Sequence, residues 1–267
     1  MKKRAGLYAA IVAAAFAATG ALASDEARKE LAPTGKLRVG LAVAPNPGAG
    51  NVQMVNGEPR GIGGDLAREL AKKLGVPVEW IQYPNSGALT DGVTTGAWDV
   101  AFLPVDAQRK QKVDFGAAHL VLQSTFLVGP NSPIQTLADV DKPGTRVVGV
   151  DNTATTRAAA ASLKNVTMTN VKGPDVLFDL LRTGQADAIA LSRESLTQLA
   201  AKLPGSRLLP GAFLSSYVAV AVPKNKPAAL AYASALVEEM KASGMVRRSL
   251  DAVGMQGSVV APAGVKP

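Results

Sequence analysis

The chain has 267 residues, with 29 Lys and Arg against 21 Asp and Glu, a formal charge of +8 at pH 7, and no cysteine. The lack of cysteine excludes a disulfide framework and a lipid-anchored cysteine. Basic residues are scattered singly or beside acids, and aromatic residues make up only 4% of the chain. The clustered basic face or stacking platform that nucleic-acid binding requires is therefore missing.

Residues 1–23 have the features of a secretory signal peptide. The first four residues include three basic side chains, residues 5–18 are uncharged and rich in alanine, and small residues precede Ser24. The alternative is an uncleaved membrane anchor, but the apolar run is short for a bilayer span and consists largely of weakly apolar alanines. We therefore expect cleavage near Ala23 and a protein that works outside the cytoplasm.

Short β-branched runs alternate with helical periods, which is typical of an α/β sheet protein with crossover helices. Leu66, Leu70 and Leu74 share one stripe with charged residues mostly opposite, which predicts an amphipathic helix ended by Gly75. The last strand of this half leads toward Arg109 at its carboxyl end, where open α/β sheets bind ligands. In chain order, we predict a strand at 36–41, a helix at 65–74, a strand at 78–81, a short helix at 88–95 and a strand at 98–103.

The same order of elements recurs in the second half of the chain, which predicts a second, smaller α/β lobe. Two extended runs, residues 120–130 and 217–222, adjoin turn-rich segments and suit a hinge crossed twice. The tail from residue 258 onward is expected to be loose or laid on the surface. The remaining predicted elements are strands at 145–150 and 186–191 and helices at 153–163, 174–183, 227–242 and 245–253. We predict a discontinuous first lobe (36–127 and 222–267) around a second lobe (131–216).

Three motifs carry a resemblance to a known family. They are residues 57–71 at the first helix, residues 106–115 around Arg109, and residues 144–150 at the opening of the second lobe. With these motifs in this order, the chain resembles the polar amino-acid class of periplasmic solute-binding proteins, bacterial solute-binding family 3. The resemblance implies a two-lobed periplasmic-binding-protein clamshell. It also implies that the lobes close on one small-molecule ligand and that the protein hands this ligand to a membrane-embedded ABC transporter permease.

The family resemblance implies that Arg109 binds the ligand's carboxylate, for which a planar guanidinium is well suited. The alternative is a solvated arginine at a helix start. The sequence also departs from the amino-acid binders. Residues 101–104 lack their hydroxyl side chains, Ser192 stands where an acid usually meets the ligand's ammonium group, and the aromatic residues that sandwich the ligand are absent. Glu194 is one candidate to replace the missing acid.

The turn at residues 151–155 begins a predicted helix of the second lobe. A helix amino terminus offers free N–H groups and the positive end of the helix dipole, so it suits an anion. Thr155 is expected to contact the ligand from its family position, whereas for Thr153 simple N-capping is an equal alternative. The expected ligand is a small carboxylate-bearing molecule, an amino acid or a related organic acid. The predicted ligand-binding residues are Arg109, Thr155, Thr153, Ser192, Asn46, Ser86, Phe102, Pro104 and Asn152.

Cofactors and metals are not expected from this sequence. Residues 61–64 are rich in glycine, but Leu66 occupies the place of the third glycine of a dinucleotide fingerprint. His119 is the single histidine in a chain without cysteine, so neither a His/Cys metal site nor a Ser-His-Asp arrangement is predicted.

An enzyme remains the alternative function, because some proteins that resemble this family are secreted cyclohexadienyl dehydratases. Such chemistry needs an acid in the cleft, and Asp106 and Glu194 are the nearby candidates. Asp106 is better explained as an N-cap and Glu194 as an acid at a helix start. We therefore expect a monomeric binding protein rather than an enzyme or a receptor-linked sensor domain.

Overall fold

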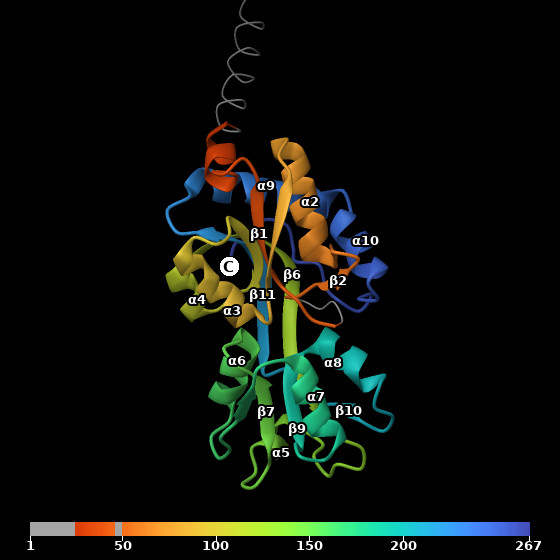
Figure 1. Ribbon diagram of the computed structural model, residues 1–267. Coiled ribbons are helices and arrows are strands. Elements are labelled where there is room, and N and C mark those ends of the chain that lie inside the picture. Colours follow the sequence, from red (N-terminus) through yellow and green to blue (C-terminus); the bar gives the residue numbers. More distant parts are fainter. Residues whose placement is uncertain (1–24, 46–49) are drawn as a thin grey trace, which may run out of the picture.

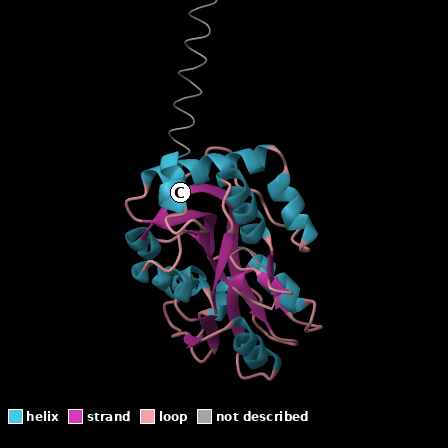
Figure 2. Ribbon diagram, turned by 45° about the horizontal axis from the view of Figure 1, so that its top comes forward, coloured by secondary structure: helices cyan, strands magenta, loops and turns pink. Residues whose placement is uncertain are grey.

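The computed structural model describes residues 25–45 and 50–267, so the predicted signal peptide lies outside the described residues. Two α/β lobes are joined by two long strands that run through both of them (Figure 1). Helices lie around the strands on the outside of the molecule (Figure 2). The mixed α/β, two-lobed architecture predicted from the sequence is confirmed.

The first lobe is built on the parallel strands β4, β1 and β5, with Val39 paired to both Trp80 and Val100. The leucine stripe of α2 is buried in the main core of this lobe, and Gly75 ends the helix in the left-handed conformation, φ 65°. The elements are β1 (Leu37–Ala42), β2 (Gln53–Val55), β3 (Glu58–Arg60), α2 (Ile62–Leu74), β4 (Val78–Tyr83), α3 (Ser86–Asp91), the 3-10 helix η1 (Gly92–Thr95), β5 (Val100–Pro104), α4 (Ala107–Lys112), α9 (Pro227–Ala242) and α10 (Met245–Ala252).

The two strands that cross between the lobes are β6 (Val113–Val128) and β11 (Leu214–Pro223), which pair antiparallel along most of their length. The last residues of β6 also pair with β9 (Ala188–Ser192) of the second lobe, where Ser124 lies opposite Ser192. The prediction from the sequence located both crossings, but it started the first one at residue 120, whereas β6 begins at Val113. Residues 116–118, a glycine and two alanines, have low strand propensity, and it is the pairing of β6 with β11 that makes this part extended.

The second lobe continues the same sheet through β9, β7 and β8, which run parallel to one another. Its helices pack on both faces of these strands, over one core around Phe126 and another around Leu177. The elements are α5 (Leu137–Val140), β7 (Val147–Val150), α6 (Ala154–Ser162), β8 (Thr169–Val171), α7 (Pro174–Arg182), β9 (Ala188–Ser192), α8 (Arg193–Ala200) and β10 (Arg207–Leu208).

The C-terminal tail is laid along β6 rather than loose. Backbone hydrogen bonds join Val121 to Val259 (2.8 Å), Ala118 to Val265 (2.9 Å) and Ala261 to the carbonyl of His119 (3.1 Å). Ala261 is 3% exposed. The tail therefore covers the first-lobe end of a strand that crosses between the lobes.

Candidate functional site

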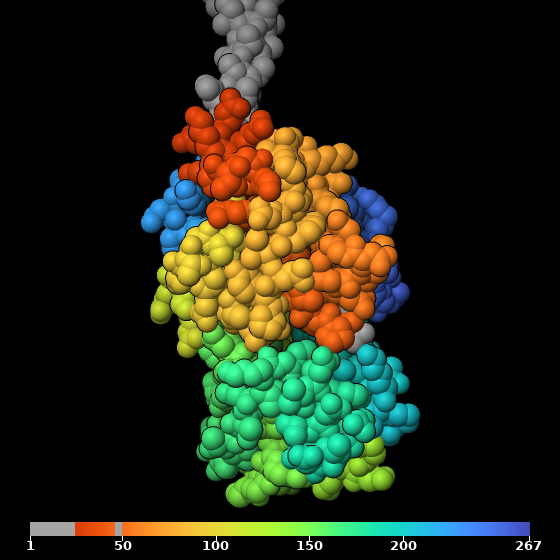
Figure 3. Space-filling model, viewed as in Figure 1, coloured from red at the N-terminus to blue at the C-terminus, as the bar shows by residue number. Residues whose placement is uncertain are grey.

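A cavity of about 90 Å³ lies between the two lobes. The lobes meet at a narrowed waist on the surface of the molecule (Figure 3). Loops at the carboxyl ends of β1, β4 and β5 form the first-lobe side of this central cavity, and the starts of α6, α7 and α8 form the other side. Its lining residues are Ala42, Val43, Ala44, Gly50, Asn51, Pro84, Asn85, Ser86, Pro104, Leu122, Val150, Thr153, Thr155, Pro174, Leu191, Ser192 and Ser195.

Two of the three helix amino termini on the second-lobe side of the central cavity are capped by side chains. Thr153 is the N-cap of α6, where its side chain accepts from the Thr156 N–H at 3.1 Å. Ser192 is the N-cap of α8 and accepts from the Ser195 N–H at 3.3 Å. Thr155 is 8% exposed, and its Oγ1 lies 3.1 Å from Ser124 Oγ. Both helices thus direct the positive ends of their dipoles toward the same cavity.

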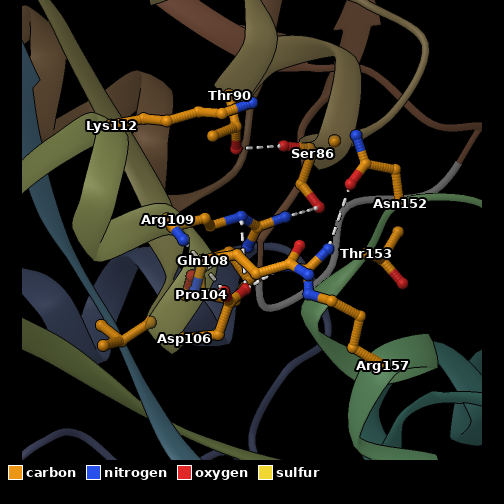
Figure 4. A network of polar contacts seen from close by, with 12 residues as sticks. Ser86, Thr90, Pro104, Asp106, Gln108, Arg109, Lys112, Asn152, Thr153 and Arg157 are labelled. Atoms are coloured by element: carbon orange, nitrogen blue, oxygen red, sulfur yellow. Dashed lines mark hydrogen bonds and ion pairs between the residues drawn. The ribbon is translucent and has the colours of Figure 1, made fainter. Parts of the chain in front are cut away.

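Arg109 lies in the short helix α4, directly after β5, and is 1% exposed. Asp106 caps this helix by accepting from the backbone N–H groups of Gln108 and Arg109. The guanidinium donates from Nη1 to the Pro104 carbonyl and from Nη2 to Ser86 Oγ, both at 2.8 Å (Figure 4). The alternative of a solvated arginine is therefore excluded.

Arg109 keeps its positive charge although it is buried. Burial lowers the pKa of Arg109 to about 10, while the nearby Asp106 carboxylate acts in the opposite direction. The side chain thus remains a cation at neutral pH. Its Nε lies 3.6 Å from Asp106 Oδ2 and has no hydrogen-bonding partner among the described residues. A buried cation with an unused donor is able to take a further anionic partner.

Arg109 lines a separate cavity of about 30 Å³ and not the central one. The Ser86 hydroxyl stands between the two, because Ser86 lines the central cavity and accepts from Arg109. The residues around the smaller cavity are Thr90, Asp91, Gln108, Arg109, Lys112, Asn152 and Arg157.

Polar contacts join the lobes around this second cavity and beside the central cavity. Arg157 of α6 pairs with Asp106, and Asn152 Nδ2 donates to Asp91 Oδ2 at 3.0 Å. Asn85 Nδ2 donates to the Lys172 carbonyl at 3.2 Å. The structure is thus a closed arrangement in which the lobes contact each other directly.

The structure brings together five of the residues predicted from the sequence around the central cavity: Ser86, Pro104, Thr153, Thr155 and Ser192. Arg109 and Asn152 lie at the smaller cavity, and Phe102 lines a third, rear cavity next to His119. Asn46 lies outside the described residues.

Sequence reasoning missed Ser195, Asn51 and Arg157. Ser195 follows Ser192 at the N3 position of the same helix, so its spacing was a usable signal. Asn51 and Arg157 reach their places only through the folding of a loop and the closure of the lobes, so neither has a local signal in the sequence.

The two acids that were candidates for catalysis in the enzyme alternative lie elsewhere than in the central cavity. Asp106 caps α4 and pairs with Arg157, and Glu194 lies in the first turn of α8, where burial raises its pKa. Neither lines the central cavity.

Across residues 25–45 and 50–267, no group of three or more His, Asp or Glu side chains is placed to hold a metal ion. None of the helices in this part of the chain is long and apolar enough to cross a membrane.

A family profile described as bacterial extracellular solute-binding proteins, family 3, matches residues 39–252. Among curated proteins, a probable histidine-binding protein of Campylobacter jejuni is 26% identical over 185 residues, which is 68% of this chain and 68% of that protein.

Solved structures share the fold. A mutant of ArgBP from T. maritima has a TM-score of 0.75 at 24% identity, with 85% of this chain and 99% of that chain covered. An ancestral amino-acid-binding protein, described as a precursor of cyclohexadienyl dehydratase, has a TM-score of 0.73 at 24% identity, covering 84% and 98% of the two chains.

Proposed function

Because the chain belongs to the bacterial extracellular solute-binding proteins, family 3, we propose that it captures a small carboxylate-bearing ligand between its lobes. The ligand is an amino acid or a related organic acid, which the protein delivers to a membrane-embedded ABC transporter permease. The curated relative named for histidine binding supports this class of ligand. We also propose that residues 1–23 are a signal peptide cleaved near Ala23, so that the mature chain acts as a monomer in the periplasm.

The observation that carries this proposal is the cavity between the lobes, which two helix amino termini face and behind which a buried arginine lies. A carboxylate in this cavity accepts hydrogen bonds from Thr155 and from the first N–H groups of α6. When the Ser86 side chain turns away, the same carboxylate reaches Nη2 of Arg109, and the free Nε supplies a second donor. Both lobes then hold one negative charge.

The lining of the central cavity restricts the rest of the ligand. No acidic side chain is among the described lining residues, and Ser192 supplies only a hydroxyl group. A buried ammonium group without a counter-charge is costly. The cavity therefore favours either an organic acid or an amino acid whose ammonium group bonds to carbonyl oxygens.

Catalysis on this fold is less well supported, because Asp106 and Glu194 are both absent from the described cavity lining.

The proposal is tested by identifying the molecule that the protein binds. The purified mature chain is unfolded, the released compounds are identified by mass spectrometry, and the refolded chain is titrated with each by calorimetry. A carboxylate-bearing compound should bind one-to-one, and at 100 times its Kd it should add about 2.7 kcal/mol to the free energy of unfolding. Failure of every released compound, amino acid and organic acid to bind contradicts the proposal, and turnover of prephenate supports the enzyme instead.

Thr155→Val provides a site-specific version of the same test. The substitution removes one hydroxyl from the central cavity at nearly constant volume, and loss of a hydrogen bond to a charged group weakens binding by about tenfold or more. Thr197→Val is the matched control, because Thr197 is exposed on α8 and bonds only to its own helix. Equal affinities of the two variants would remove Thr155 from the site.

A further inference from the structure

A rear cavity of about 10 Å³ adjoins the central cavity in the first lobe. The two share Ala42, Gly50 and Asn51 as lining residues, so these residues lie between them. The other residues around the rear cavity are Gly40, Leu41, Val52, Ile62, Gly63, Phe102 and His119. Apart from Asn51 and His119, all of these side chains are apolar.

His119 is completely buried in β6, edge-on to the Phe102 ring with the ring centroids 5.6 Å apart. Neither ring nitrogen has a hydrogen-bonding partner among the described residues. Burial lowers the pKa of His119 to about 3, and the nearby Lys241 acts in the same direction. The imidazole is therefore neutral at physiological pH and offers one N–H donor and one acceptor nitrogen.

Asn51 contributes a third unpaired polar atom to the same place. Its Oδ1 is buried and has no partner within the described part of the chain. An unpaired buried polar group is costly, and native proteins leave few of them. Three such atoms on two residues that line one cavity indicate that this cavity receives a hydrogen-bonding group.

We propose that the rear cavity is a subsite that recognises an uncharged hydrogen-bonding group of the ligand, a hydroxyl or a carboxamide, through His119 and Asn51. This inference rests on the proposed function and extends it to the ligand's far end. Both groups donate and accept, which matches a neutral imidazole beside an amide oxygen. The cavity volume of about 10 Å³ has room for about one water-sized group, so a hydroxyl or the outer end of a carboxamide enters it. A charged group is excluded, because the apolar walls provide no counter-charge.

The test compares ligands of nearly equal shape that differ in this group. Calorimetry measures the affinities of L-threonine against L-valine, L-asparagine against L-leucine, and malate against succinate. In whichever pair binds, wild type should have an affinity for the polar compound at least about tenfold higher than for the apolar one. A site built around hydrogen bonds discriminates strongly against an analogue without them. Asn51→Leu and His119→Leu should reduce this preference to about twofold, whereas the exposed control Asn170→Leu should retain it.

A second readout does not depend on the His119 variant folding. The chain has a single histidine, so nitrogen-15 NMR of the imidazole reports on the rear cavity alone. The polar ligand should shift the ring resonances more than its apolar partner does, and Asn51→Leu should reduce the difference. Binding with no polar preference, or with a preference unchanged in Asn51→Leu and equal ring shifts, overturns the subsite while the proposed function stands. If no compound of any pair binds, the proposed function fails for this class of ligand, and the subsite fails with it.

Discussion

Arg157 in α6 of the second lobe pairs with the Asp106 carboxylate, which is the N-cap of α4 in the first lobe. Arg109 lies in the same short helix, three residues after Asp106. Closure of the lobes therefore places a second-lobe cation against the helix that holds the buried arginine of the site. Asp106 serves both roles at once, because one oxygen caps the helix while the other meets Arg157.

Replacing Arg157 with alanine should favour the open arrangement and weaken ligand binding by about threefold to tenfold. Both partners are largely buried, with side-chain exposures of 25% and 18%, so their pairing exceeds the small contribution of an exposed ion pair. Lys224→Ala is the control, since it breaks a pair with Asp114 inside the first lobe. Calorimetric affinities that fall equally in both variants would contradict a role in closure.

Gly87→Ala should block closure without destabilising either lobe. A Cβ at Gly87 would lie 2.7 Å from Asn152 Cβ and would also overlap the Asn152 carbonyl oxygen, so the two lobes could not approach as closely. Within α3 itself, alanine is a better helix former than glycine. The affinity measured by calorimetry should fall by at least about tenfold, while the melting temperature of the unliganded protein stays the same or rises.

The matched control for Gly87 is Gly173→Ala. Gly173 has φ −154°, which any residue adopts, and no atom lies within 4 Å of the added Cβ. This variant should bind like wild type. Wild-type affinity in Gly87→Ala would show that the ligand does not require the close approach of α3 and Asn152.

Arg109→Ala should weaken binding by about two orders of magnitude or more, because truncating one partner of a buried charged hydrogen bond costs about 2–5 kcal/mol. It should also lower the free energy of unfolding, since the Pro104 carbonyl and Ser86 lose their donor. Arg109→Lys should be damaging as well, because an ammonium group lacks the planar fork. The exposed Lys72→Ala should have little effect on either quantity. A folded Arg109→Ala that binds as tightly as wild type would refute the carboxylate assignment.

Buried His119 should make the free energy of unfolding depend on pH. Its pKa is about 3 in the folded chain and about 6.5 when unfolded. Between these values the unfolded chain binds the extra proton, so this contribution to stability is complete above pH 6.5 and declines as the pH falls toward 3. From pH 7 to pH 5, wild type should lose about 2 kcal/mol more than His119→Leu in urea unfolding. Equal losses would show that the imidazole is accessible or protonated in the folded state.

Sequence patterns predicted the lobes because local rules and tertiary structure agree there. The stripe of Leu66, Leu70 and Leu74 faces the core as its helical spacing requires, and Gly75 adopts the conformation expected of a helix end. The start of β6 around Gly116 has no such local signal, because its extended form comes from pairing with β11. The close packing there is tertiary too, since a Cβ on Gly116 would meet Ser234 and Val220.

Only family position and the predicted helix ends allowed site residues to be predicted from the sequence. Thr153 and Ser192 precede helices, and both cap them beside the central cavity. The direction of the Arg109 side chain was not predictable, because it depends on the Pro104 carbonyl and on a hydroxyl from another helix. Asn51 reaches the cavity from a loop, and no periodicity or capping pattern marks it.

Small-angle X-ray scattering of the refolded mature chain, with and without its bound compound, tests the two-lobed binding mechanism most directly. The hinge strands β6 and β11 connect the lobes, and Arg157 and Asn152 make contacts across the cleft in the arrangement described above. A ligand that binds at micromolar concentration or tighter should reduce the radius of gyration and bring the scattering curve to that of the structure described above. An unchanged radius of gyration at saturation would contradict closure of the lobes on a ligand.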